Sequence, residues 1–118
     1  MSSDGIDFNK MPMVYWSAKT KMSLLQRRII VYSIMYYQKS QSCVSDRYYD
    51  AISRQLCILA KQNPEEYKHT EYYYAMYDFD GTTGFDIPDR LNKNDLEKLT
   101  RIANVVLSQW QVSGGKML

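Results

Sequence analysis

Apolar residues recur at three- and four-residue steps in three stretches of this sequence, which is the period of an α-helix that buries one face. A chain of 118 residues is about the size of one domain. We therefore expect a mainly α fold, a small helical domain in which the three faces share one core. The apolar positions are, in chain order, Met22, Leu25, Ile29, Tyr32 and Tyr36; Tyr49, Ile52, Leu56 and Leu59; and Leu96, Leu99, Ile102, Ala103, Val106, Leu107 and Trp110.

Residues that stabilise helix ends flank these stretches. The side chain of Ser17 or Ser23 can cap the first helix by accepting a hydrogen bond from a free N–H of its first turn. Ser45 and Asn92 can cap the second and third helices in the same way. The polar run 38–42 should end the first helix. Asn63-Pro64 should end the second, because the residue before proline avoids helical angles, and a short helical turn is expected directly after it.

The two ends of the chain differ from the body in composition. Residues 1–12 are polar and are expected to form a flexible tail, and the apolar residues 13–16 are expected to pack against the domain. Ser113-Gly114-Gly115 can stop the last helix in a left-handed turn, which leaves residues 113–118 as a second tail. We therefore expect a single helical domain at residues 13–112.

The segment from Glu71 to Arg90 loses the helical period. Aromatic residues crowd both sides of Asp80-Gly81, which predicts a short β-hairpin or an irregular aromatic segment. Asp78, Asp80 and Asp86 could hold a cation, or one of them could cap a turn. Their spacing does not match a calcium-binding loop, which favours the capped turn.

Composition excludes several classes of protein. Two cysteines without C-x-x-C spacing and a single histidine make a zinc site improbable, so no metal is expected. No apolar run approaches the ~20 residues of a membrane span, and the polar N-terminus is not a signal peptide. These features predict a cytoplasmic protein with reduced thiols.

Charge and tyrosine content each allow two interpretations. Residues 8–45 carry six bases and no acid, which could attract phosphate or an acidic partner or could simply solvate a helix face. Because these bases point in several directions around a helix, any DNA binding should be weak and salt-dependent. The eleven tyrosines suit a binding surface or half-wet pocket, and a tyrosine-rich core would produce the same count.

The most specific motif is Tyr36-Tyr37, followed by Val44-Ser45-Asp46 and then Tyr49-Asp50. In this motif the chain resembles domain Ia of bacterial NAD-dependent DNA ligases, a helical hairpin in which two aromatic residues end one helix and an Asp-x-x-Tyr-Asp pattern opens the next. The resemblance covers about residues 22–66 and includes the Asn-Pro-Glu that follows the second helix. Tyr37 stands where many members of that family carry histidine.

The resemblance implies a site for the nicotinamide mononucleotide (NMN) half of NAD. It places Tyr36 and Tyr37 against the nicotinamide ring, and Asp46 and Asp50 at the ribose hydroxyls and the amide, with Tyr49 packed between them. The residues suit that ligand, because a tyrosine face attracts a pyridinium cation and a carboxylate accepts hydrogen bonds from hydroxyls. On a helix, Asp46, Tyr49 and Asp50 would share one side.

Other parts of the sequence define what such a module can do. The chain contains no Lys-x-Asp-Gly adenylation motif, so we expect no ligase or other enzymatic activity from it. The run Phe79 to Asp86 is similar to small stand-alone ligase-related proteins carried by phages and other mobile elements. The resulting hypothesis is a phage-type, non-catalytic module that binds NAD or NMN in the host cytoplasm.

Two alternatives remain at the level of sequence. The first is a phage-type inhibitor, anti-defence or accessory protein that contacts a host protein through a tyrosine-rich surface, with the motif kept for packing. The second is a detached piece of a split ligase that docks on a separate catalytic chain.

Overall fold

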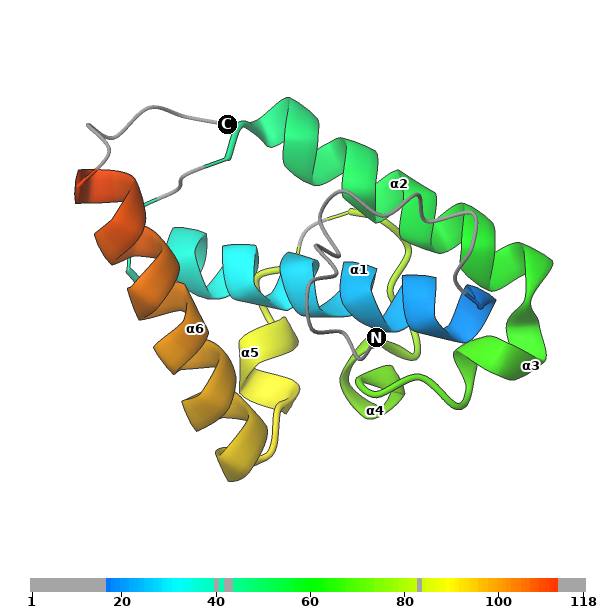
Figure 1. The fold of residues 1–118 in the computed structure, drawn as a ribbon. Helices are drawn as coiled ribbons and strands as arrows, with labels where there is room; N and C mark the ends of the chain where they lie inside the picture. Colours follow the sequence, from blue (N-terminus) through cyan, green and yellow to red (C-terminus); the bar gives the residue numbers. More distant parts are fainter. Residues whose placement is uncertain (1–16, 40, 42–43, 83, 113–118) are drawn as a thin grey trace, which may run out of the picture.

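We describe a computed structural model of the chain, in which residues 17–39, 41, 44–82 and 84–112 are described. The fold is mainly α, as the periodicity predicts, and the described residues contain helices and turns without a β-strand. The expected tails and the expected contacts of residues 13–16 lie outside the described residues. The helices are α1 (Ala18–Ser33), a π-helical turn (Ile34–Gln38), α2 (Asp46–Gln62), α3 (Pro64–Tyr67), α4 (Tyr73–Met76), α5 (Ile87–Arg90) and α6 (Lys93–Val112) (Figure 1).

Helix α1 lies at the centre of the arrangement (Figure 1). Helix α2 runs back alongside α1 in the opposite direction, so the two form a helical hairpin. Helix α6 crosses the C-terminal end of α1, and the short helices α4 and α5 lie on the side of α1 away from α2. None of the helices in the described part of the chain is long and apolar enough to cross a membrane.

The core forms where α1 is covered from several sides. Met22, Leu25 and Ile29 of α1 are buried, as the apolar stripe predicts. Ile30 and Ile34 lie beside that stripe and are buried as well, because α1 contacts α2 on one side and α5 and α6 on others. The partners of α1 in the core are Val44, Ile52, Leu56, Tyr67, Tyr72, Ala75, Met76, Ile87, Leu91, Leu99, Ala103 and Leu107.

The end of the first helix differs from the simple periodic pattern. Residues 34–38 form a π-helical turn, in which each turn of backbone contains one extra residue. The apolar stripe therefore shifts at this point: Met35 is fully buried, whereas Tyr36 is 54% exposed and Tyr37 42% exposed. The α-helical period places Tyr36 on the buried stripe, and this part of the prediction is wrong.

The predicted helix caps are confirmed. Ser17, not Ser23, caps α1, and its Oγ accepts a hydrogen bond from Thr20 N at 3.2 Å. Ser45 Oγ accepts from Tyr48 N at 3.1 Å, and Asn92 Oδ1 accepts from Asp95 N at 2.7 Å. Helix α2 ends at Gln62, directly before Asn63-Pro64, and the short turn expected after it is α3.

Residues 71–90 form the irregular aromatic segment of the prediction, but not a β-hairpin. The described residues contain the single-turn helices α4 and α5, joined by a bend around Gly81, whose φ is +89°. Arg90 fastens this segment by pairing with Asp78 and, at 3.0 Å, with Asp86. A hairpin needs two extended stretches of backbone, and here the two stretches are helical turns: α4 and α5 contact each other, and α5 also contacts α1.

Buried polar contacts attach the same segment to α1. Gln26 is fully buried, and its Nε2 donates to Thr70 Oγ1 at 2.8 Å while its Oε1 accepts from Tyr72 N at 3.1 Å. The Tyr67 hydroxyl donates to Met76 O at 2.6 Å. A buried amide with both ends satisfied stabilises one arrangement of the chain, so these bonds fix where the start of α4 lies against α1 and where its end lies against α3.

Candidate functional site

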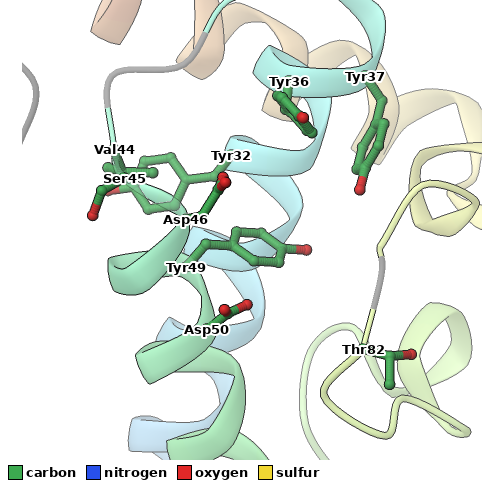
Figure 2. A pocket seen from close by; sticks show the side chains of 9 residues that line it. All are labelled: Tyr32, Tyr36, Tyr37, Val44, Ser45, Asp46, Tyr49, Asp50 and Thr82. Carbon is green, nitrogen blue, oxygen red and sulfur yellow. The ribbon is translucent and has the colours of Figure 1, made fainter.

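A cleft of about 430 Å³ opens at the junction of the α1–α2 hairpin and the loop that follows α4 (Figure 2). All five residues of the predicted site line it: Tyr36, Tyr37, Asp46, Tyr49 and Asp50. Tyr32, Val44, Ser45 and Thr82 complete the lining. The volume lies within the usual range of small-molecule sites, roughly 300–1,000 Å³.

The π-helical turn presents the two adjacent tyrosines. The rings of Tyr36 and Tyr37 meet edge to face, with centroids 4.8 Å apart and an interplanar angle of 66°. Tyr37 also contacts Phe85, at a centroid distance of 6.4 Å. In a regular α-helix two consecutive side chains diverge by about 100°, so the wider turn helps to bring both rings to the same opening.

The first two turns of α2 present the carboxylates. Asp46, Tyr49 and Asp50 are spaced i, i+3 and i+4, and all three side chains lie on the same side of the cleft (Figure 2). Both carboxylates are exposed. Ser45, the N-cap of α2, lines the cleft beside them, so the cap that starts the helix also positions its acidic residues.

Tyr49 forms the inner boundary of the cleft and connects it to the core. Ser33 Oγ donates its proton to Ile29 O at 2.8 Å, so the 2.9 Å contact between Ser33 and Tyr49 requires the Tyr49 hydroxyl to be the donor. Burial raises the pKa of the Tyr49 phenol. The protonated phenol is therefore the form that the structure holds, with its ring fixed between the two helices.

Thr82 lies across the opening from α2 (Figure 2). The sequence motif does not predict that this residue lines the cleft. Its N–H and its hydroxyl both donate to Asp80 Oδ1, at 3.0 and 2.6 Å. Asp80 thus caps a turn, as the spacing of the acids favours. The Asp80-Gly81 turn is visible in the sequence, but its position opposite α2 depends on how the loop packs.

The charged side chains among the described residues that line the cleft are all acidic. The described lining includes two carboxylates and four tyrosine rings, and no lysine, arginine or histidine. Arg90 lies in a neighbouring cavity of about 200 Å³ that shares Thr82 with the cleft, and its guanidinium is already held by Asp78 and Asp86. The described lining therefore combines two carboxylates with aromatic faces, a combination that attracts flat cations.

The part of the chain that the structure describes contains no cluster of side chains suited to bind a metal ion. No three His, Cys, Asp or Glu side chains there are grouped to hold one. Cys57 is a free cysteine whose thiol pKa is raised by burial, so it is less reactive than an exposed thiol. The chemistry that the cleft offers is stacking, ion pairing and hydrogen bonding.

No protein-family model matches this chain, and searches of curated proteins and of solved structures found no similar protein. The likeness to ligase domain Ia and to phage ligase-related proteins therefore stays a prediction from the motif. The helical hairpin and the cleft are properties of this fold in their own right.

Proposed function

We propose that this protein is a non-catalytic module that binds the NMN half of NAD in the cleft between α1 and α2. The observation that carries the proposal is the convergence of Tyr36, Tyr37, Asp46, Tyr49 and Asp50 on one cavity of about 430 Å³. They come from two separate helices, so the motif alone does not guarantee that they meet.

Each part of the ligand has a chemical partner in the proposal. The exposed faces of Tyr36 and Tyr37 offer stacking and cation–π contact to the pyridinium ring. Asp46 and Asp50 offer acceptors to the ribose hydroxyls and to the amide N–H groups. The Tyr49 ring, which its bond to Ser33 holds in place, sets the depth to which the ring system can enter.

The expected affinity is modest. The cleft is open on one side, and the ligand is a half-molecule that must lose its own translational freedom on binding. We expect a Kd between the high-micromolar and millimolar range, which corresponds to roughly 4–6 kcal/mol. NAD should bind no more than slightly better than NMN if only the nicotinamide half is held.

Isothermal titration calorimetry with NMN tests the proposal. Asp50 is exposed and lies beyond the first turn of α2, so Asp50→Asn should keep the fold and weaken NMN binding by about fivefold or more. Glu97→Gln is the matched control, because it removes the same charge from an exposed position on α6 and should leave the Kd unchanged. Absence of binding heat at millimolar NMN would rule the proposal out.

A second candidate is a partner-binding surface, and the exposed aromatic rings favour it. Tyr36, Tyr37 and Phe85 form a connected row in which Phe85 is 61% exposed. Exposed aromatic side chains that contact one another are typical of protein interfaces. In this case the module would act as an inhibitor or accessory protein on a bacterial host protein.

Phe85 separates the two candidates, because it belongs to the row of rings but not to the lining of the cleft. For a partner-binding surface, Phe85→Ala should abolish capture of one defined protein from bacterial lysate and leave NMN binding intact. Ile58→Ala, at an exposed apolar position on α2, is the control for non-specific stickiness. Capture that survives Phe85→Ala argues against the aromatic row as the interface.

A further inference from the structure

We infer that the cleft discriminates the redox state of nicotinamide, so that it binds oxidised NMN and excludes the reduced form. This inference rests on the proposed function and specifies which form of the ligand the same site takes. Two observations carry it: the charge of the cleft lining and the exposure of the tyrosine faces. Oxidised nicotinamide is a flat cation, whereas the reduced ring is neutral.

The charge of the lining favours the cation. Asp46 and Asp50 are exposed at the cleft, and neither has an ion-pair partner among the interactions seen in the described residues. The described lining contains no basic side chain that would cancel them. A pyridinium stacked on the tyrosines, with its ribose and amide at these carboxylates, gains Coulomb energy from both, and a neutral dihydropyridine lacks this attraction.

The arginine of the neighbouring cavity is already paired. Arg90 borders the cavity next to the cleft, where it pairs with Asp78 and Asp86 and lies over the Tyr77 ring, with its Cζ 5.5 Å from the centroid. These contacts occupy its guanidinium with two carboxylates other than Asp46 and Asp50. Arg90 is therefore not an unpaired base that would neutralise the two carboxylates of the lining.

The faces of Tyr36 and Tyr37 also favour the oxidised ring over the reduced one. Tyr36 and Tyr37 are about half exposed, so a ring can reach them from solvent. Their π-faces carry partial negative charge and attract a cation, worth roughly a few-fold in affinity at an exposed site. The reduced ring is also puckered at its saturated carbon, which makes flat stacking poorer.

The two ligands form a matched pair, because oxidised and reduced NMN carry the same ribose and phosphate. The phosphate therefore experiences the same repulsion from Asp46 and Asp50 in both, and the ratio of the two Kd values isolates the ring. We expect oxidised NMN to bind about tenfold or more tightly than reduced NMN at low ionic strength. Raising the salt to about 0.5 M should reduce that ratio.

The test is calorimetric titration of the full chain with each ligand, repeated on Asp50→Asn and on the control Glu97→Gln. Asp50→Asn should lower the ratio by about threefold or more, and Glu97→Gln should leave it unchanged. Equal affinity for the two forms, or tighter binding of the reduced form, overturns this inference and leaves the proposed function standing. Binding of neither ligand overturns both.

Discussion

At the scale of single residues, the Tyr49 hydroxyl joins the core to the cleft. It donates to Ser33, which in turn donates to the backbone of α1, so the ring has one preferred position. Gly84 is buried directly against this pair. A Cβ at residue 84 would overlap the Tyr49 hydroxyl and would lie 2.8 Å from Ser33 Oγ.

Gly84→Ala should therefore destabilise the protein by about 1–3 kcal/mol through overpacking, and should weaken NMN binding because the Tyr49 ring must move. Denaturant unfolding measures the first effect and calorimetry the second. The double variant Gly84→Ala, Tyr49→Phe removes the clashing hydroxyl, so its loss of stability should be smaller than the sum of the single losses. Additive losses would show that the close contact is not the cause.

At the scale of elements, the cleft is built where one helix ends and the next begins. The π-helical turn presents two tyrosines, and the N-terminal turns of α2 present two aspartates. Ser45 has two roles here, since it caps α2 and also lines the cleft. Ser17 caps α1 with the same geometry but is not part of the cleft lining.

This pair of caps gives a matched test. Ser45→Ala and Ser17→Ala should each cost about 1 kcal/mol of stability, because each leaves a first-turn N–H without its acceptor. Only Ser45→Ala should also weaken NMN binding, since the first turn of α2 carries Asp46. Thermal unfolding and calorimetry report the two effects separately. Equal losses of affinity in both variants would contradict a local role for the α2 cap.

At the scale of the whole molecule, one core supports both the hairpin and the aromatic segment. Tyr67 contributes to it through its 2.6 Å bond to Met76 O. Burial raises the pKa of the Tyr67 phenol to about 12, whereas an unfolded tyrosine titrates near 10. The native state therefore favours the neutral phenol.

The protein should therefore lose a part of its folding stability at alkaline pH. The contribution of Tyr67 is fully present below about pH 10 and is lost as the pH rises through about 12, because the unfolded chain releases the proton first. Tyr67→Phe should lower stability by about 1 kcal/mol at neutral pH and make the alkaline decline shallower. Denaturant unfolding at several pH values across this range measures the free energy of unfolding of both proteins. Tyr77→Phe, at an exposed position, should keep the full decline.

Much of the local structure follows from short-range chemistry. The apolar period, the caps at Ser45 and Asn92 and the stop before Pro64 each depend on residues within one or two helical turns. The two acids and Tyr49 share a face for the same reason. The segment after Glu71 does not follow from local pattern, because its aromatic residues suit a strand or a helical turn equally. Its helical turns form where α4 and α5 contact each other and α5 contacts α1.

The sequence by itself determines the three long helices α1, α2 and α6, their capping residues and the chemical character of the motif, because these depend on neighbours along the chain. The tertiary structure alone decides that Tyr36 and Tyr37 turn outward, that Thr82 faces α2 and that Gly84 closes on Tyr49. The positions of Thr82 and Gly84 depend on contacts between residues more than thirty apart in sequence, whereas the two tyrosines turn outward at the π-helical turn. The long-range contacts form only once the loop that carries Thr82 and Gly84 packs against the hairpin, where Gly84 meets Tyr49.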